Sequence, residues 1–116
     1  MNSKQKGKRG ELEAAKILKD LGIGTPRRAQ QYSGVAGSSD LVGVPGLAIE
    51  VKRQERASYS HLVEWMHQAT NAATDQEKPI VMHRKARSDW VITLKAQDLP
   101  EIAQAVLLAM ELSSDA

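Results

Sequence analysis

Two acids and a lysine lie around a short hairpin-like segment in the first half of the chain. Asp40 precedes an apolar pair, and Glu50 and Lys52 belong to the run Ala48-Ile49-Glu50-Val51-Lys52. Side chains alternate across a strand, so Glu50 and Lys52 share one face with Cα atoms about 6.6 Å apart. Magnesium prefers oxygen ligands, usually one or two carboxylates with water and substrate phosphate. The spacing therefore predicts a metal-dependent phosphodiesterase site, to which Lys52 adds a cation.

The face on which Asp40 lies depends on the turn between the two segments. If Pro45 and Gly46 formed a two-residue turn, Asp40 would stand opposite Val51 and point away from Glu50. A two-residue hairpin prefers positive φ at its first central residue, whereas proline is locked near about −65°. A three-residue turn or a bulge is therefore expected. Either one places Asp40 on the face of Glu50.

A third acid, Glu11, lies in a helix expected over residues 8–21, where apolar residues recur at helical spacing until Gly22. Glu11 precedes Ala15 by four residues and Leu18 by seven, which puts it on the apolar stripe. Two interpretations stay open. Glu11 is either a glutamate near a helix start, favoured by the macrodipole, or an acid that faces the metal site.

The composition is that of an ordinary folded protein, with 116 residues, 41% of them hydrophobic and 26% charged. It predicts one domain over residues 1–116, with flexible ends at 1–6 and 113–116. The absence of cysteine excludes disulfides, thiolate zinc sites and a cysteine nucleophile. No apolar run approaches the roughly 18 residues of a membrane span, and the N-terminus lacks the apolar stretch of a signal peptide. A cytoplasmic protein without a membrane partner is expected.

Basic residues gather at the N-terminus and around the acidic motif, although the net charge is only +2. Such clusters suit phosphate, and the alternative is an ordinary solvated surface. Aromatic residues are scarce, so a stacking platform for single-stranded bases is not expected and a duplex backbone is the better partner. The predicted DNA-binding set is Lys6, Lys8, Arg9, Arg27, Arg28, Arg53 and Arg56.

The remaining elements follow from periodicity and turn signals. A strand is expected around 23–31, followed by a loop of small residues at 32–39, and a helix capped by Ser58 or Ser60 is expected to run to about Thr74. Two short strands follow at 79–82 and 90–94. A last helix begins at Pro100, with an inward face of Ile102, Ala103, Val106, Leu107 and Met110. The predicted order is helix, three strands, helix, two strands, helix, which is an α/β fold.

Histidine offers no competing metal chemistry. His61 and His67 are six residues apart, and two ligands on one helical face need a spacing of four. The single Glu64-x-x-His67 is half of what a di-iron bundle requires, and His83 is isolated. No phosphate loop, nucleophile elbow or dinucleotide fingerprint occurs, so no small-molecule cofactor is expected.

With these residues in place, the chain resembles nucleases of the PD-(D/E)XK superfamily, and among them the archaeal-type and phage Holliday junction resolvases. The resemblance runs through residues 6–13, the Ser33-Gly34 loop, Ser39-Asp40-Leu41 and residues 48–52, and more loosely to Trp90. It implies a restriction-endonuclease-like domain with a central mixed five-stranded sheet flanked by helices. One departure is Ser39, which stands where many members carry the proline of the motif's name.

The resemblance also implies roles for individual residues. Asp40 and Glu50 would bind Mg²⁺, for which Mn²⁺ would substitute, and the Val51 carbonyl would complete the coordination. Glu11 would reach the metal through water, and Lys52 would orient or help deprotonate water. Ser33 matches a loop serine that resolvases bring to the scissile phosphate.

Three functions remain open at this stage. The first is a junction resolvase, expected to be a homodimer because paired incisions need paired sites. The second is another nuclease of the same fold, which acts on branched, nicked or linear duplex DNA. The third is a DNA-binding module that has lost its activity, and the retention of Glu11, Asp40, Glu50 and Lys52 argues against it. Candidate dimer surfaces are the C-terminal helix and the face of Trp65, although burial in the core of a monomer would explain both equally well.

Overall fold

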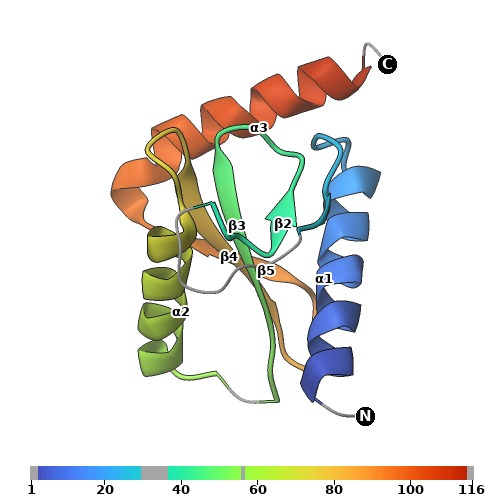
Figure 1. The fold of residues 1–116 in the computed structure, drawn as a ribbon, viewed down its shortest axis with the longest axis vertical. Helices are drawn as coiled ribbons and strands as arrows, with labels where there is room; N and C mark the ends of the chain where they lie inside the picture. Colours follow the sequence, from blue (N-terminus) through green and yellow to red (C-terminus); the bar gives the residue numbers. More distant parts are fainter. Residues whose placement is uncertain (1–2, 30–36, 56, 115–116) are drawn as a thin grey trace.

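The computed structural model of the protein describes residues 3–29, 37–55 and 57–114. A five-stranded sheet lies between helices, with α1 and α2 on its two sides and α3 across one end (Figure 1). In chain order the elements are α1 (Ser3–Asp20), β1 (Arg27–Arg28), β2 (Leu41–Val42), β3 (Leu47–Arg53), α2 (Tyr59–Ala72), β4 (Lys78–Arg84), β5 (Val91–Leu94), the 3₁₀ turn η1 (Ala96–Asp98) and α3 (Leu99–Ser114).

The strands follow the sheet in chain order, β1-β2-β3-β4-β5. Three neighbouring pairs are antiparallel, and β3 and β4 are parallel because α2 connects them as a crossover. The prediction of an α/β fold with a mixed five-stranded sheet and the order αβββαββα is confirmed.

Alternation along the central strands separates two apolar layers. Ile80 and Met82 of β4 belong to the larger core, which also contains residues of α1, β3 and α3. Val81 faces the other way and packs with Trp65 and Ala69 of α2. Both faces of the sheet are therefore covered by helix, which explains why β3 and β4 are apolar along most of their length.

Most element boundaries agree with those expected from the sequence, with two clear differences. Helix α1 begins at Ser3, five residues before the expected start, and β1 is limited to Arg27–Arg28. Helix α2 is capped by Ser58, whose side chain accepts a hydrogen bond from the His61 N–H, so the first of the two proposed caps is correct. The backbone of residues 3–6 and 113–114 belongs to α1 and α3, and the ends beyond them lie outside the described residues.

The predicted inward face of α3 is wrong in part. Ile102 is buried and Val106 packs against the core, but Leu107 and Met110 are exposed at 67% and 42%, and Ala103 is exposed as well. Ala109 takes the buried position instead. The helix is apolar nearly all round, so periodicity could not choose between two faces that differ by a small rotation.

No helix in the described part of the chain is long and apolar enough to cross a membrane.

Candidate active site

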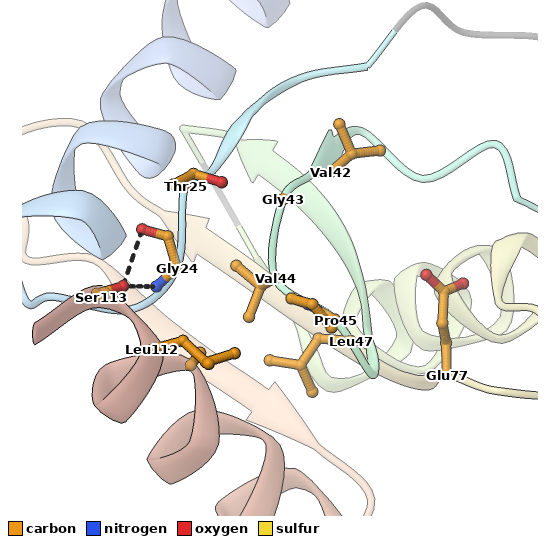
Figure 2. Close-up of a pocket in the computed structure, with 11 residues that line it drawn as sticks. Gly24, Thr25, Val42, Gly43, Val44, Pro45, Leu47, Glu77, Leu112 and Ser113 are labelled. Carbon is orange, nitrogen blue, oxygen red and sulfur yellow. Dashed lines mark hydrogen bonds between the residues drawn. The ribbon is translucent and has the colours of Figure 1, made fainter. Parts of the chain in front are cut away.

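The turn between β2 and β3 sets the register on which the site depends. Leu41 pairs with Ile49, which puts Asp40 across from Glu50. Residues 44–47 form a β-turn with Pro45 and Gly46 at its centre, closed by a hydrogen bond from the Leu47 N–H to the Val44 carbonyl at 3.2 Å. Figure 2 shows Val44, Pro45 and Leu47 of this turn. Gly46 supplies the positive φ of +88° that this turn needs. Pro45 and Gly46 thus do form a two-residue turn, but the strand register across it is offset by one residue, and the prediction that Asp40 lies on the face of Glu50 is confirmed.

Asp40 is held by strands on both sides. Its backbone N–H donates to the Ile49 carbonyl at 3.0 Å, and its carbonyl accepts from the Ala29 N–H at 3.0 Å. Its carboxylate Oδ2 accepts a hydrogen bond from the Val51 N–H at 2.8 Å. Strand β3 runs on to Arg53, beyond the point where its antiparallel neighbour β2 begins at Leu41. The Asp40 carboxylate therefore accepts a β3 backbone N–H that would otherwise bond to the next carbonyl of a longer β2.

Glu11 approaches the same place from α1. Glu11 is only 8% exposed, and its carboxylate accepts a hydrogen bond from Arg28 Nε at 2.8 Å. Because α1 begins at Ser3, Glu11 lies well inside the helix, and there is no acidic residue in the first turn. The interpretation of Glu11 as a helix-start glutamate is therefore wrong, and its position on the apolar stripe calls for another explanation.

One cavity of about 360 Å³ brings the predicted acids and the lysine together. It lies between α1 and the part of β3 that extends past β2. Its walls are formed by Gly7, Gly10, Glu11, Asp40, Glu50, Val51, Lys52, Arg53 and Gln54.

Sequence reasoning missed the two glycines and Gln54. Gly7, Gly10 and Glu11 recur at a spacing of three and four residues, which places them on one face of α1. A methyl group added at Gly10 would lie 3.4 Å from Arg53 Cβ, an ordinary van der Waals contact, so this face of α1 lies directly beside β3. The sequence signal that could have identified them is the pair of glycines on the same helical stripe as Glu11.

Two carboxyl groups in the cavity, those of Glu50 and Glu11, have a raised pKa. Burial is the largest cause for Glu50, and the nearby Asp40 carboxylate adds to it, so that the pKa of Glu50 rises to about 8 although Lys52 opposes the shift. Burial likewise raises the pKa of Glu11, against the hydrogen bond from Arg28. Without a cation, the site holds more acidic groups than it can keep ionised at neutral pH.

This donor set fits a divalent cation. The Asp40 carboxylate disfavours the charge of the buried Glu50, which a bound cation would relieve, and Val51 lines the same cavity. Among the described residues, no three Asp, Glu, His or Cys side chains are grouped closely enough to ligate one ion. The chain would therefore supply two carboxylates and a carbonyl, which leaves positions for water and substrate, as magnesium prefers.

The predicted DNA-binding residues fall into two groups. Lys8, Arg9 and Arg27 are exposed, whereas Arg28 pairs with Glu11, and Arg53 lies 3.8 Å from Glu13. The sequence showed which residues are basic, but it did not show that some of them serve as partners of buried or half-buried acids. Ser33, Arg56 and the side chain of Lys6 lie outside the described residues.

A separate cavity of about 390 Å³ lies at the other end of β3, between the turn at Pro45 and the end of α3 (Figure 2). Val44, Leu47 and Leu112 make it largely apolar, and Ser113 Oγ accepts a hydrogen bond from the Gly24 N–H at 3.0 Å. It contains none of the residues that the sequence predicted for catalysis. The acidic cavity is therefore the candidate active site.

Comparison with known proteins agrees with this geometry. Residues 2–111 match the family described as "Phage putative PDDEXK endonuclease", which is most of the chain. No curated protein and no solved structure matches the chain. Endonucleases of this superfamily hydrolyse phosphodiester bonds of DNA and typically use a divalent metal. The chain belongs to the phage PD-(D/E)XK endonuclease family.

Proposed function

We propose that the protein is a magnesium-dependent, structure-selective endodeoxyribonuclease that resolves four-way DNA junctions by paired, symmetric nicks. The observation that carries the proposal is the convergence of Glu11, Asp40, Glu50 and Lys52 on one cavity, with Asp40 across from Glu50. The motif order from the helix glutamate to the lysine, which resembles that of junction resolvases, supports the choice of substrate.

In this proposal Asp40 and Glu50, together with the Val51 carbonyl, hold the cation, and Glu11 contributes through water. When bound, the cation would screen the charge of the phosphodiester and lower the pKa of the attacking water. Mn²⁺ is expected to replace Mg²⁺, since both accept oxygen ligands.

The side chains around the metal ligands have separate tasks. Lys52, on the same face of β3 as Glu50, would orient the attacking water and stabilise the negative charge that develops on the phosphate. Arg28 would hold the Glu11 carboxylate in position through its 2.8 Å hydrogen bond. Ser33, carried over by the resemblance alone, would contact the scissile phosphate.

Paired incisions call for two active sites, so we propose a homodimer. Trp65 is only 5% exposed and packs with Val81 in the core, which leaves the outward face of α3 as the better interface. Leu99, Leu107, Leu108, Met110 and Leu112 are all exposed on this helix. The dimer would act on DNA in the cytoplasm of the phage-infected cell.

The test compares an immobile four-way junction with a linear duplex of the same arm sequence, each incubated with the protein and Mg²⁺. Glu50→Ala is run in parallel, and Glu64→Ala, at an exposed position of α2, is the matched control. Paired symmetric nicks in the junction alone, lost in Glu50→Ala only, are expected. Equal cutting of both substrates would replace the resolvase with a general duplex nuclease. If neither substrate is cut, the protein is a DNA-binding module without activity.

A further inference from the structure

A single carboxylate lies between two arginines beside the catalytic cavity. Glu13 Oε2 accepts a hydrogen bond from Arg84 Nη1 at 3.0 Å, and Glu13 Oε1 lies 3.8 Å from Arg53 Nη1. The three residues come from α1, β3 and β4. We refer to Glu13, Arg53 and Arg84 as the arginine pair and its counterion.

The sheet fixes the spacing of the two arginines. Arg53 and Arg84 are partners in the parallel register of β3 and β4, at the ends of both strands, so their side chains leave the sheet on the same side. Arg53 is also part of the wall of the cavity that contains Asp40 and Glu50. The arginine pair therefore adjoins the proposed catalytic site directly.

The pair retains capacity for a further acceptor. A guanidinium has five N–H donors, and Glu13 contacts only one nitrogen of each arginine. Arg84 Nε has no hydrogen-bond partner among the described residues but is itself buried, so a further acceptor would approach the terminal nitrogens of the guanidinium. The side chains of Arg53, Arg84 and Glu13 are 22%, 26% and 29% exposed, so solvent reaches all three.

The charge of the cluster is also unbalanced. Two guanidiniums and one carboxylate leave one positive charge, held in a partly buried position where screening by water is reduced. Like charges at this distance repel each other, and Glu13 lowers that repulsion without neutralising it. An anion with several oxygen acceptors would accept the remaining N–H hydrogen bonds and neutralise the excess positive charge.

We propose that Arg53 and Arg84 form a binding site for a DNA phosphate next to the one that is cut, and that Glu13 holds the two guanidiniums in place. The inference rests on the proposed function, since it assigns a subsite of the same nuclease. Arginine suits this role because its planar fork matches phosphate oxygens. Neither Glu13 nor Arg84 belonged to the DNA-binding residues predicted from sequence.

The competing account is that the cluster only fastens α1 to the ends of β3 and β4. The two accounts differ in their response to salt. Each phosphate neutralised by a cation contributes a slope of about −0.9 to the dependence of log K on log salt for duplex DNA. A structural clamp contributes nothing to this slope.

The experiment measures binding of the protein to a short linear duplex in EDTA over a range of salt, for wild type, Arg84→Gln and Lys16→Gln. Lys16 pairs with Asp20 at an exposed position of α1, so its variant also removes an ion-paired cation. We expect Arg84→Gln to flatten the slope by about 0.9, which makes the affinity lost between about 50 and 200 mM salt roughly threefold smaller. Arg84→Lys, which keeps the charge, is expected to retain the slope with weaker binding, and it replaces Arg84→Gln if that variant does not fold.

A second variant removes the counterion. Glu13→Gln removes the negative charge from both guanidiniums and is expected to tighten DNA binding at low salt. The control is Glu55→Gln, which makes the same charge change at an exposed position after β3 and should tighten binding less. If Arg84→Gln has the slope of wild type, or if Glu13→Gln lowers only the melting temperature, the cluster is a clamp and the inference is overturned.

Cleavage by wild type in Mg²⁺ separates this failure from failure of the proposed function. A wild type that cuts DNA while Arg84→Gln keeps its salt slope would leave the nuclease intact and remove only the subsite. A wild type that neither binds nor cuts DNA would overturn both.

Discussion

The Asp40 carboxylate accepts a 2.8 Å hydrogen bond from the backbone N–H of Val51, on the strand that also carries Glu50 and Lys52. The bond links the start of β2 to the end of β3 that carries the proposed active site. Asp40 therefore has a structural task besides the proposed metal ligation.

Two substitutions separate these tasks. Asp40→Asn removes the charge but keeps an oxygen that can accept the Val51 N–H, whereas Asp40→Ala leaves this buried donor without a partner. We expect Asp40→Asn to be more stable than Asp40→Ala by about 1–2 kcal/mol in chemical denaturation without metal. Equal stabilities would mean that the hydrogen bond contributes nothing to folding.

The pKa of Glu50 makes the stability of the metal-free protein depend on pH. Its folded value is about 8 and its ordinary value is 4.5, so between these pH values the folded state keeps a proton that the unfolded state releases. The free energy of unfolding must therefore fall as pH rises through this window, by an amount on the order of a few kcal/mol. The raised pKa of Glu11 acts in the same direction.

Melting temperatures in EDTA from about pH 5 to pH 9 check this expectation. Glu50→Gln cannot release the proton, so its melting temperature should depend less on pH and exceed that of wild type at the alkaline end. Mg²⁺ should stabilise wild type most at that end, because it replaces the proton. A pH dependence that is the same in Glu50→Gln would show that Glu50 is not the responsible group.

Arg28 and Arg27 are neighbours in β1 with different expected roles. Arg28 hydrogen bonds to Glu11, and loss of this bond would raise the pKa of Glu11 further, so Arg28→Gln should increase the Mg²⁺ concentration needed for cleavage, by about tenfold. Arg27→Gln should weaken DNA binding without changing the metal requirement. Cleavage rates against Mg²⁺ concentration, measured with DNA at saturation, distinguish the two. Parallel losses in both variants would place Arg28 among the ordinary phosphate contacts.

The outward face of α3 provides the test of the proposed dimer. Leu107 and Leu108 are 67% and 53% exposed, and a glutamate at either position would place a charge in the interface. Sedimentation velocity should show a dimer for wild type and a monomer for Leu107→Glu, while Val63→Glu, at an exposed apolar position on α2, should remain a dimer. If the wild type is monomeric at all concentrations, the proposal that a preformed dimer makes the paired incisions is wrong.

Local chemistry predicted much of this structure. The restriction of φ at Pro45 excluded a primed two-residue turn and so predicted the face of Asp40, and two candidate caps, Ser58 and Ser60, predicted the start of α2, of which Ser58 is the cap. These features depend on residues a few positions apart, which is the range over which turn and cap preferences act.

Features that depend on tertiary contacts were not predicted. Helix α3 is apolar on several sides, and only its position on the sheet decides that Ala109 is buried and Leu107 is not. The partners of Arg28 and Arg84 are 17 and 71 residues away in sequence, so the basic pattern could not separate ion-paired arginines from free ones. The pKa of Glu50 likewise depends on its burial in the folded protein and on the charges of Asp40 and Glu11, which the fold brings close to it.

The most direct test of the account is cleavage of a four-way junction in Mg²⁺ by wild type, Asp40→Asn and Asp75→Asn, with binding of each followed by gel shift. Asp75 lies in an exposed turn before β4 and is the control for the same chemical change. Asp40→Asn should lose cleavage by at least about 10²- to 10³-fold and still bind the junction, and Asp75→Asn should behave as wild type. Cleavage by Asp40→Asn at the wild-type rate would contradict the assignment of this cavity as the active site.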